Sequence, residues 1–171
     1  SDRAGGGGFV IERYLVIKER VRRELHEIER VVTRVERALV SAQRNAEDAD
    51  LYVDSIALNL HDFYVGLERI CELIASNIDR SVPAGSDWHR DLLLQMTIAL
   101  PQIRPPVLTE KTIADLDEYR RFRHVVRHVY AFEFDPPRIY ALAHKLRPTW
   151  EQVRTDLSTF ASFLEDLSRS A

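Results

Sequence analysis

The chain has 171 residues, of which 45% are hydrophobic and 30% are charged, and its net charge is −3. This length fits one domain with a substantial core, and the composition is ordinary for a globular protein in water. The single cysteine, Cys71, excludes an internal disulfide framework, fits a reducing cytosol and is expected to be a buried, inert thiol. We see neither an apolar run that could span a bilayer nor a secretory signal, so we expect a cytoplasmic protein without membrane association.

Residues 1–8 are expected to form a flexible lead, typical of an added linker, because the consecutive glycines Gly5–Gly8 lose much conformational freedom in regular structure. The remainder, residues 9–171, is expected to form a single helical domain. From about Phe9 to Gln43, apolar residues recur at steps of three and four, which predicts a long amphipathic helix. The same pattern predicts a second long helix from about Ala49 to Ile78.

A short helix is expected from Trp88 to about Ala99, between a loop at residues 82–86 and a proline-rich connection at residues 101–106. The next helix should begin after Thr109, because a threonine hydroxyl is a good N-cap. It should end before the Asp-Pro-Pro sequence at residues 135–137.

The last helix is expected from Pro136 to about Ser168, with Asp135 as its cap. Pro148 lies inside this pattern and predicts a kink or a break near Arg147. No stretch shows the alternation that a strand requires. The sequence therefore predicts an all-α fold, an up-and-down bundle of four long helices and one short helix.

The helix after Thr109 carries a dense basic segment. Six of the nine residues from 120 to 128 are basic types: Arg120, Arg121, Arg123, His124, Arg127 and His128. Because the whole chain is slightly acidic, this local positive charge indicates a binding site for an anion, most simply a phosphate. His124 and His128 share one helix face, but no third metal ligand lies near them in the sequence. We therefore expect no metal site and no cofactor.

The segment also follows a recognisable spacing: Arg123, the polar His124, three further positions, His128, one residue and Tyr130. This spacing resembles the motif of HEPN-domain ribonucleases, and the version that ends in tyrosine is similar to the HepT-type toxins. The stretch Leu60–Ile70 is similar to the second helix of larger members of that family. The resemblance spans most of the chain and implies the same helical architecture.

The resemblance implies a role for each residue of the motif. Arg123 would stabilise charge on the phosphate and His128 would transfer protons. We expect His124, in the polar position of the motif, and the neighbouring Arg127 to support them. These residue types suit the chemistry, because arginine offers forked donors to phosphate oxygens and histidine titrates near neutral pH. Tyr130 matches the tyrosine that an MNT-type nucleotidyltransferase antitoxin modifies with AMP in the family.

The position of Tyr130 has two interpretations. Periodicity alone favours a buried core tyrosine. On a continuing helix, however, Tyr130 lies seven residues after Arg123 and returns to the same side of the helix. We predict that Tyr130 is exposed in the same cleft.

On an ideal helix, Arg123 and His128 lie about 140° apart, so one straight motif helix would not readily form a compact site. HEPN ribonucleases dimerise so that two motif helices line one cleft, which implies a two-fold homodimer here. The alternative is that Arg123 and His128 merely tie helices together through buried hydrogen bonds.

These observations lead to the hypothesis of a metal-independent endoribonuclease that cuts RNA through attack by the 2′-hydroxyl. The resemblance implies the toxin of a type VII-like HEPN/MNT toxin–antitoxin system, neutralised by a nucleotidyltransferase that AMPylates Tyr130. One alternative is a non-catalytic helical module that binds such a nucleotidyltransferase or its nucleotide or RNA substrate, and another is a dimeric scaffold without a nucleic-acid role. The motif residues favour the enzyme, whereas the overall acidity counts against broad, nonspecific RNA binding.

Overall fold

The computed structural model describes residues 6–170, which contain five α-helices. They are α1 (Gly6–Arg44), α2 (Ala49–Ile74), α3 (Trp88–Met96), α4 (Glu110–His128) and α5 (Pro136–Arg169). Three short turns supplement them: a 3₁₀ turn at Ala46–Asp48, a π-helical turn at Ala75–Asp79 and a 3₁₀ turn at Ala131–Glu133. No strand occurs within residues 6–170, so the predicted all-α bundle is confirmed.

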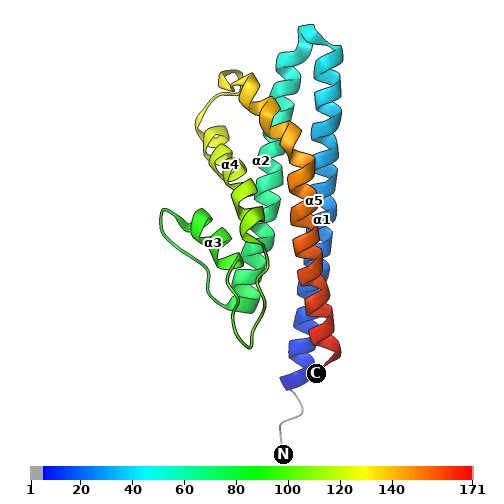
Figure 1. Ribbon diagram of the computed structural model, residues 1–171, viewed down its shortest axis with the longest axis vertical. Coiled ribbons are helices and arrows are strands. Elements are labelled where there is room, and N and C mark those ends of the chain that lie inside the picture. Colours follow the sequence, from blue (N-terminus) through cyan, green and yellow to red (C-terminus); the bar gives the residue numbers. More distant parts are fainter. Residues whose placement is uncertain (1–5, 171) are drawn as a thin grey trace, which may run out of the picture.

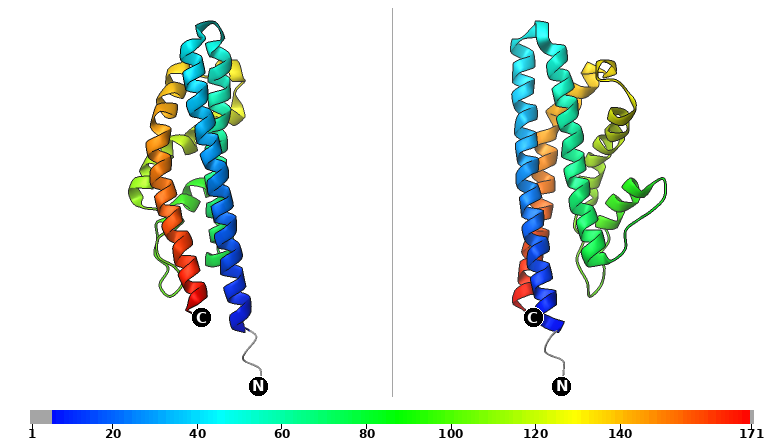
Figure 2. Two further views of the ribbon diagram at one scale, coloured as in Figure 1. Left: turned by 90° about the vertical axis from the view of Figure 1, so that its right-hand side faces the viewer. Right: turned by 180° about the vertical axis from the view of Figure 1, so that it is seen from behind.

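Helices α1, α2 and α5 form the long body of the molecule. Figure 1 shows α1 and α2 as an antiparallel hairpin, with α5 returning along α1 so that it ends beside the start of α1. Helices α3 and α4 lie on the side of α2 that faces away from α1 (Figure 2, right). None of the helices in the described range is long and apolar enough to cross a membrane.

The helix boundaries differ from the predicted ones, among other places, in α1, α3 and α5. Helix α1 begins at Gly6, so Gly6–Gly8 form its first turn rather than part of a flexible lead, and the rest of that lead, residues 1–5, lies outside the described residues. Helix α3 ends at Met96, before the predicted end. Helix α5 continues through Pro148, so of the predicted kink or break the break is excluded. Figure 1 shows the first part of α5 inclined to the remainder, as expected when a proline removes one hydrogen bond without ending the helix.

The core meets α4 at a cluster of three aromatic rings. Phe63 on α2 lies edge-on to Tyr119 on α4 and to Trp150 on α5, with ring centroids 5.4 Å and 6.3 Å apart. All three side chains are buried, and each contributes about 1.5–3 kcal/mol through removal of its apolar surface from water. Tyr119 also donates a hydrogen bond of 2.7 Å to the carbonyl oxygen of Leu142. These contacts hold α4 against both α2 and α5.

Two buried residues of α2 show how closely that helix is packed. At Gly66, a Cβ atom would lie 2.9 Å from Cγ1 of Ile28, so α1 approaches α2 at a distance that only glycine permits. Cys71 is fully buried, and burial, with a smaller contribution from the charge of Glu68, raises the pKa of its thiol to about 12. The prediction of a buried thiol is therefore confirmed, and the raised pKa favours the protonated, unreactive form.

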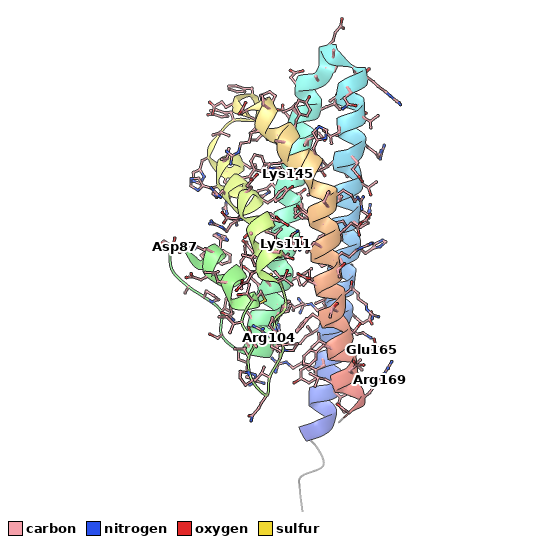
Figure 3. The ribbon with its side chains drawn as sticks, viewed as in Figure 1. Asp87, Arg104, Lys111, Lys145, Glu165 and Arg169 are labelled. Carbon is pink, nitrogen blue, oxygen red and sulfur yellow. The ribbon has the colours of Figure 1, made fainter. Side chains whose placement is uncertain are left out.

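A buried ion pair anchors the connection between α3 and α4. The side chains of Arg104 and Asp79 are 0% and 1% exposed, and Nη2 of Arg104 donates to Oδ2 of Asp79 over 2.7 Å. Arg104 also donates to the carbonyl oxygens of Ile98 and Gln95, and the Gln95 amide donates to Asp79. Figure 3 shows Arg104 near the lower end of α2. This network fixes the residues that carry α3 beside α4.

Replacing Arg104 with methionine should lower the free energy of unfolding by about 3–5 kcal/mol, because Asp79 would remain buried without its partner. Urea denaturation followed by circular dichroism measures the change. The matched control is Arg90→Met on the exposed side of α3, which should change stability by no more than about 0.5 kcal/mol. Adding Asp79→Asn to Arg104→Met should restore part of the loss; equal stability of Arg104→Met and the parent protein would contradict the anchor.

Candidate active site

Helix α4 presents the basic segment to one cleft of about 740 Å³. The cleft is bounded by α4, by Ser86 and the start of α3, and by the start of α5. The residues that line it are Ser86, His89, Arg120, Arg121, Arg123, His124, Val125, Arg127, His128 and Arg138. All four residues predicted to catalyse or support the reaction, Arg123, His124, Arg127 and His128, therefore lie at this cleft.

The cleft changes one expectation about the geometry of the motif. Arg123 and His128 were expected on different sides of one helix, yet both line the same cleft within a single chain, because the cleft follows a wide arc of α4. They lie at different depths. The side chain of Arg123 is 16% exposed, whereas His128, the last residue of α4, is exposed. Within a single chain, the largely buried side chain of Arg123 and the exposed imidazole of His128 thus line the same cleft.

Arg123 connects α4 to two other helices. Its Nη1 lies 3.2 Å from Nε2 of His89 on α3, and its Nη2 lies 3.6 Å from Oε1 of Glu68 on α2. The side chain of Glu68 is 7% exposed, and its Oε2 lies 2.6 Å from Nδ1 of His89. Within residues 6–170, Nε of Arg123 is buried without a hydrogen-bond partner. Arg123 therefore makes contacts between helices, as the alternative without catalysis expects. At least one of its N–H groups, on Nε, makes no hydrogen bond within residues 6–170.

One hydrogen bond defines the tautomer of His128. Its Nδ1 lies 2.7 Å from the backbone carbonyl oxygen of His124. Because a carbonyl oxygen can only accept, Nδ1 must carry a proton, and a neutral His128 then has an unprotonated Nε2. The rings of His124 and His128 are stacked with centroids 4.0 Å apart, which restricts the orientation of both. In the neutral tautomer, Nε2 is therefore the atom of His128 that accepts a proton.

The charge of the cleft is strongly positive. Five arginines and three histidines line it, and no aspartate or glutamate does. Arg120 and Arg121 both bind Asp117, and although burial acts in the opposite direction, these two hydrogen bonds lower the pKa of that carboxyl. Arg127 and Arg138 have no acidic partner within 4.0 Å in the described part of the chain. Such a lining attracts an anion with several phosphates.

Tyr130 does not lie where a continuing helix would place it. Helix α4 ends at His128, and Val129 and Tyr130 are extended, so the prediction that Tyr130 shares the helix side of Arg123 is wrong. Tyr130 is nevertheless 71% exposed, which excludes the core position that periodicity favoured. Its ring stacks on Phe132, which is 83% exposed, with centroids 5.5 Å apart and planes at 5°. Neither ring lines the cleft, but Tyr130 follows the cleft residue His128 by two positions.

Two further polar side chains of α2 are partly or fully covered. His61 is half-buried, and its Nε2 has no hydrogen-bond partner within residues 6–170. Burial lowers its pKa, nearby Asp62 opposes this change, and the charge of Arg123 reinforces it. Tyr64 is fully buried, and burial followed by the charge of Glu68 raises the pKa of its hydroxyl. Neither residue lines the cleft.

Glu68 and His89 were missed by sequence reasoning. Glu68 carries a weak signal, because an acidic residue directly follows the buried Leu67 in an otherwise apolar stretch of α2. His89 carries none, because its contact with Arg123 depends on how the short helix α3 packs against α4.

No group of three or more His, Cys, Asp or Glu side chains in the described range is arranged to hold a metal ion.

The fold and the cleft define a class of protein: an all-α bundle with an arginine-rich, histidine-bearing cleft on one helix. A family described as HepT-like protein matches residues 55–164, from the first turns of α2 almost to the end of α5. The match covers more than half of the chain and the whole motif, so this chain belongs to the HepT-like family of HEPN-type toxins. No curated protein and no solved structure matched significantly.

Proposed function

We propose that this protein is a metal-independent endoribonuclease that acts in the cytoplasm as the toxin of a HEPN/MNT toxin–antitoxin pair. The observation that carries the proposal is the joint position of Arg123 and His128 at one cleft that contains no acidic side chain. Membership of the HepT-like family supports the toxin role. The positive lining provides the electrostatic attraction that an RNA backbone needs, even though the chain as a whole is slightly acidic.

The proposed reaction uses the substrate's own nucleophile. The 2′-oxygen attacks the adjacent phosphorus while its proton passes to Nε2 of His128, and Arg123 stabilises the charge that develops on the phosphate oxygens. The bond from phosphorus to the 5′-oxygen then breaks, which leaves a 2′,3′-cyclic phosphate and a 5′-hydroxyl. The leaving oxygen needs a proton from a second donor. His124 lies beside His128 at the cleft, and with Arg127 it has a supporting role.

A two-fold homodimer would complete this arrangement. Two copies of the cleft, placed face to face, would bring one imidazole to each side of the same phosphate, so that one accepts a proton while the other donates one. We expect light scattering at micromolar concentration to give the mass of a dimer. Replacing Phe132, which lies outside the cleft, with serine should leave that mass unchanged; a monomeric mass for the parent protein would contradict the dimer.

We further propose that an MNT-type nucleotidyltransferase silences the toxin by AMPylation of Tyr130. The hydroxyl oxygen of Tyr130 would attack the α-phosphorus of ATP and release pyrophosphate. The exposure of Tyr130, at 71%, supports access by a second enzyme. The product would place a bulky, negatively charged group two residues after His128, where it would obstruct RNA and offset the positive charge of the cleft.

A second candidate function follows from the contacts of Arg123. Its engagement with Glu68 and His89 fits a structural role, as expected for a non-catalytic module that binds a nucleotidyltransferase partner or its nucleotide or RNA substrate. One assay distinguishes the two functions. The purified protein is incubated with total RNA and EDTA beside the Arg123→Ala/His128→Ala double variant. Cleavage by the parent protein alone supports the enzyme, and RNA binding without cleavage supports the module.

A further inference from the structure

We propose that His89, on the short helix α3, is a positioning residue that holds Arg123 in its orientation at the cleft. This inference rests on the proposed ribonuclease function and adds a residue that the motif does not contain. Helix α3 belongs to the segment between α2 and α4, which is the part of the chain that closes the cleft opposite α4. His89 both lines the cleft and contacts Arg123.

The first observation is a three-membered chain of contacts across three helices. Glu68 on α2 contacts Nδ1 of His89 over 2.6 Å, and Nε2 of His89 contacts Nη1 of Arg123 over 3.2 Å. Glu68 and Arg123 are also directly attracted to each other, with Oε1 and Nη2 separated by 3.6 Å. His89 therefore completes a closed triangle of polar contacts, in which each member touches the other two.

The second observation is that only one protonation state of His89 satisfies both contacts. The arginine guanidinium can donate hydrogen bonds but cannot accept them, so Nε2 of His89 must accept and cannot carry a proton. The proton of the neutral ring is then on Nδ1, where it is donated to the Glu68 carboxylate. The imidazole thus links an acceptor on α2 to a donor on α4.

The third observation is that the ring has little freedom. The indole of Trp88 lies against the His89 imidazole, with centroids 3.6 Å apart and planes at 34°. The side chains of Glu68, Arg123 and His89 are 7%, 16% and 23% exposed, so water competes weakly for their hydrogen bonds. The Arg104–Asp79 anchor holds the connection that follows α3.

The consequence concerns the direction of the Arg123 guanidinium. Contacts on Nη1 and Nη2 hold its plane against α2 and α3. Each of these two nitrogens keeps a second N–H for a phosphate in the cleft that Arg123 lines, whereas Nε is buried. A cation held in advance stabilises a developing charge without reorganisation, and loss of such alignment commonly costs about 10²-fold in rate. We expect His89 to act on kcat more than on KM, since Arg127 and Arg138 still attract the RNA.

Two substitutions test the contacts of the two ring nitrogens of His89 separately. In His89→Gln, the amide oxygen takes the place of Nε2 and can still accept from Arg123. In His89→Asn, the amide nitrogen takes the place of Nδ1 and can still donate to Glu68, but nothing accepts from Arg123. We expect His89→Gln to keep most of kcat and His89→Asn to lose about tenfold or more, with KM for a defined RNA oligonucleotide little changed in both.

The same assay contains the outcomes that would overturn the inference. Full activity of His89→Asn would show that the contact with Arg123 is dispensable. An equal loss of kcat in His89→Gln and His89→Asn, with thermal midpoints equal to that of the parent protein, would show that the loss does not arise from the contact with Arg123. Combining His89→Asn with Arg123→Ala should lower kcat no further than Arg123→Ala alone, because both changes remove the same function.

A measurement on the parent protein does not depend on activity or on the folding of variants. The ¹⁵N chemical shifts of the His89 ring distinguish a proton on Nδ1 from one on Nε2, and we expect Nδ1–H. A proton on Nε2 would overturn the proposal. If the parent protein does not cut RNA at all, the ribonuclease assignment fails, while the tautomer still decides whether His89 holds Arg123.

Discussion

Alanine in place of Arg123 or of His128 should lower the rate of RNA cleavage by about 10² or more, measured in buffer that contains EDTA. The first change removes the cleft cation that we propose stabilises the phosphate, and the second removes the imidazole that we propose accepts the proton at Nε2. The products of the parent protein should carry 2′,3′-cyclic phosphate and 5′-hydroxyl ends. Initial rates on a labelled RNA, with end analysis by mass spectrometry, test both expectations.

The controls for this experiment use the same residue types away from the cleft. Arg23→Ala and His26→Ala both alter exposed positions of α1 and should leave the rate unchanged. Arg123→Lys should fall between the parent protein and Arg123→Ala, because lysine keeps the charge but loses the forked donors. Cleavage that requires a divalent ion, or a double variant that cuts as well as the parent protein, would show that the assignment is wrong.

AMPylation of Tyr130 should abolish RNA cleavage. The added phosphate carries negative charge to the residues that follow α4, close in sequence to the cleft residues Arg127 and His128, and the adenosine adds bulk there. Co-expression with an MNT-type nucleotidyltransferase of the same system, followed by peptide mass spectrometry, should place AMP on Tyr130. The half-buried Tyr52 and Tyr140 should remain unmodified.

The Tyr130→Phe variant separates modification from simple binding. It removes the accepting hydroxyl and keeps the exposed ring that stacks on Phe132, so it should retain cleavage and escape silencing. A second variant, Phe132→Leu, changes the neighbouring ring but leaves the Tyr130 hydroxyl in place and should still be silenced. Silencing of the parent protein without AMP on Tyr130 would leave binding by the partner as the mechanism.

For the fold, local sequence patterns were sufficient at most positions. The apolar repeats of α1 and α2 predicted both helices, because an amphipathic helix must turn one continuous stripe toward the core. Thr109 was identified as a cap, and its side chain does accept a hydrogen bond from the Thr112 backbone. The end of α4 was predicted less well: no residue between His128 and Asp135 forbids a helix, and the chain needs this stretch to turn back into α5.

The sequence by itself determined which α4 residues could perform chemistry. Arg123, His124, Arg127 and His128 lie within six residues, so any helix formed there carries them close together. The tertiary structure decided what surrounds them. Glu68 and His89 reach Arg123 from α2 and α3, at separations in sequence that no local period encodes. Their convergence depends on the core contacts of Tyr119 and on the Arg104–Asp79 anchor, which set where α4 and α3 lie. Spacing along one helix gives the donors of a site, whereas their partners come from packing between helices.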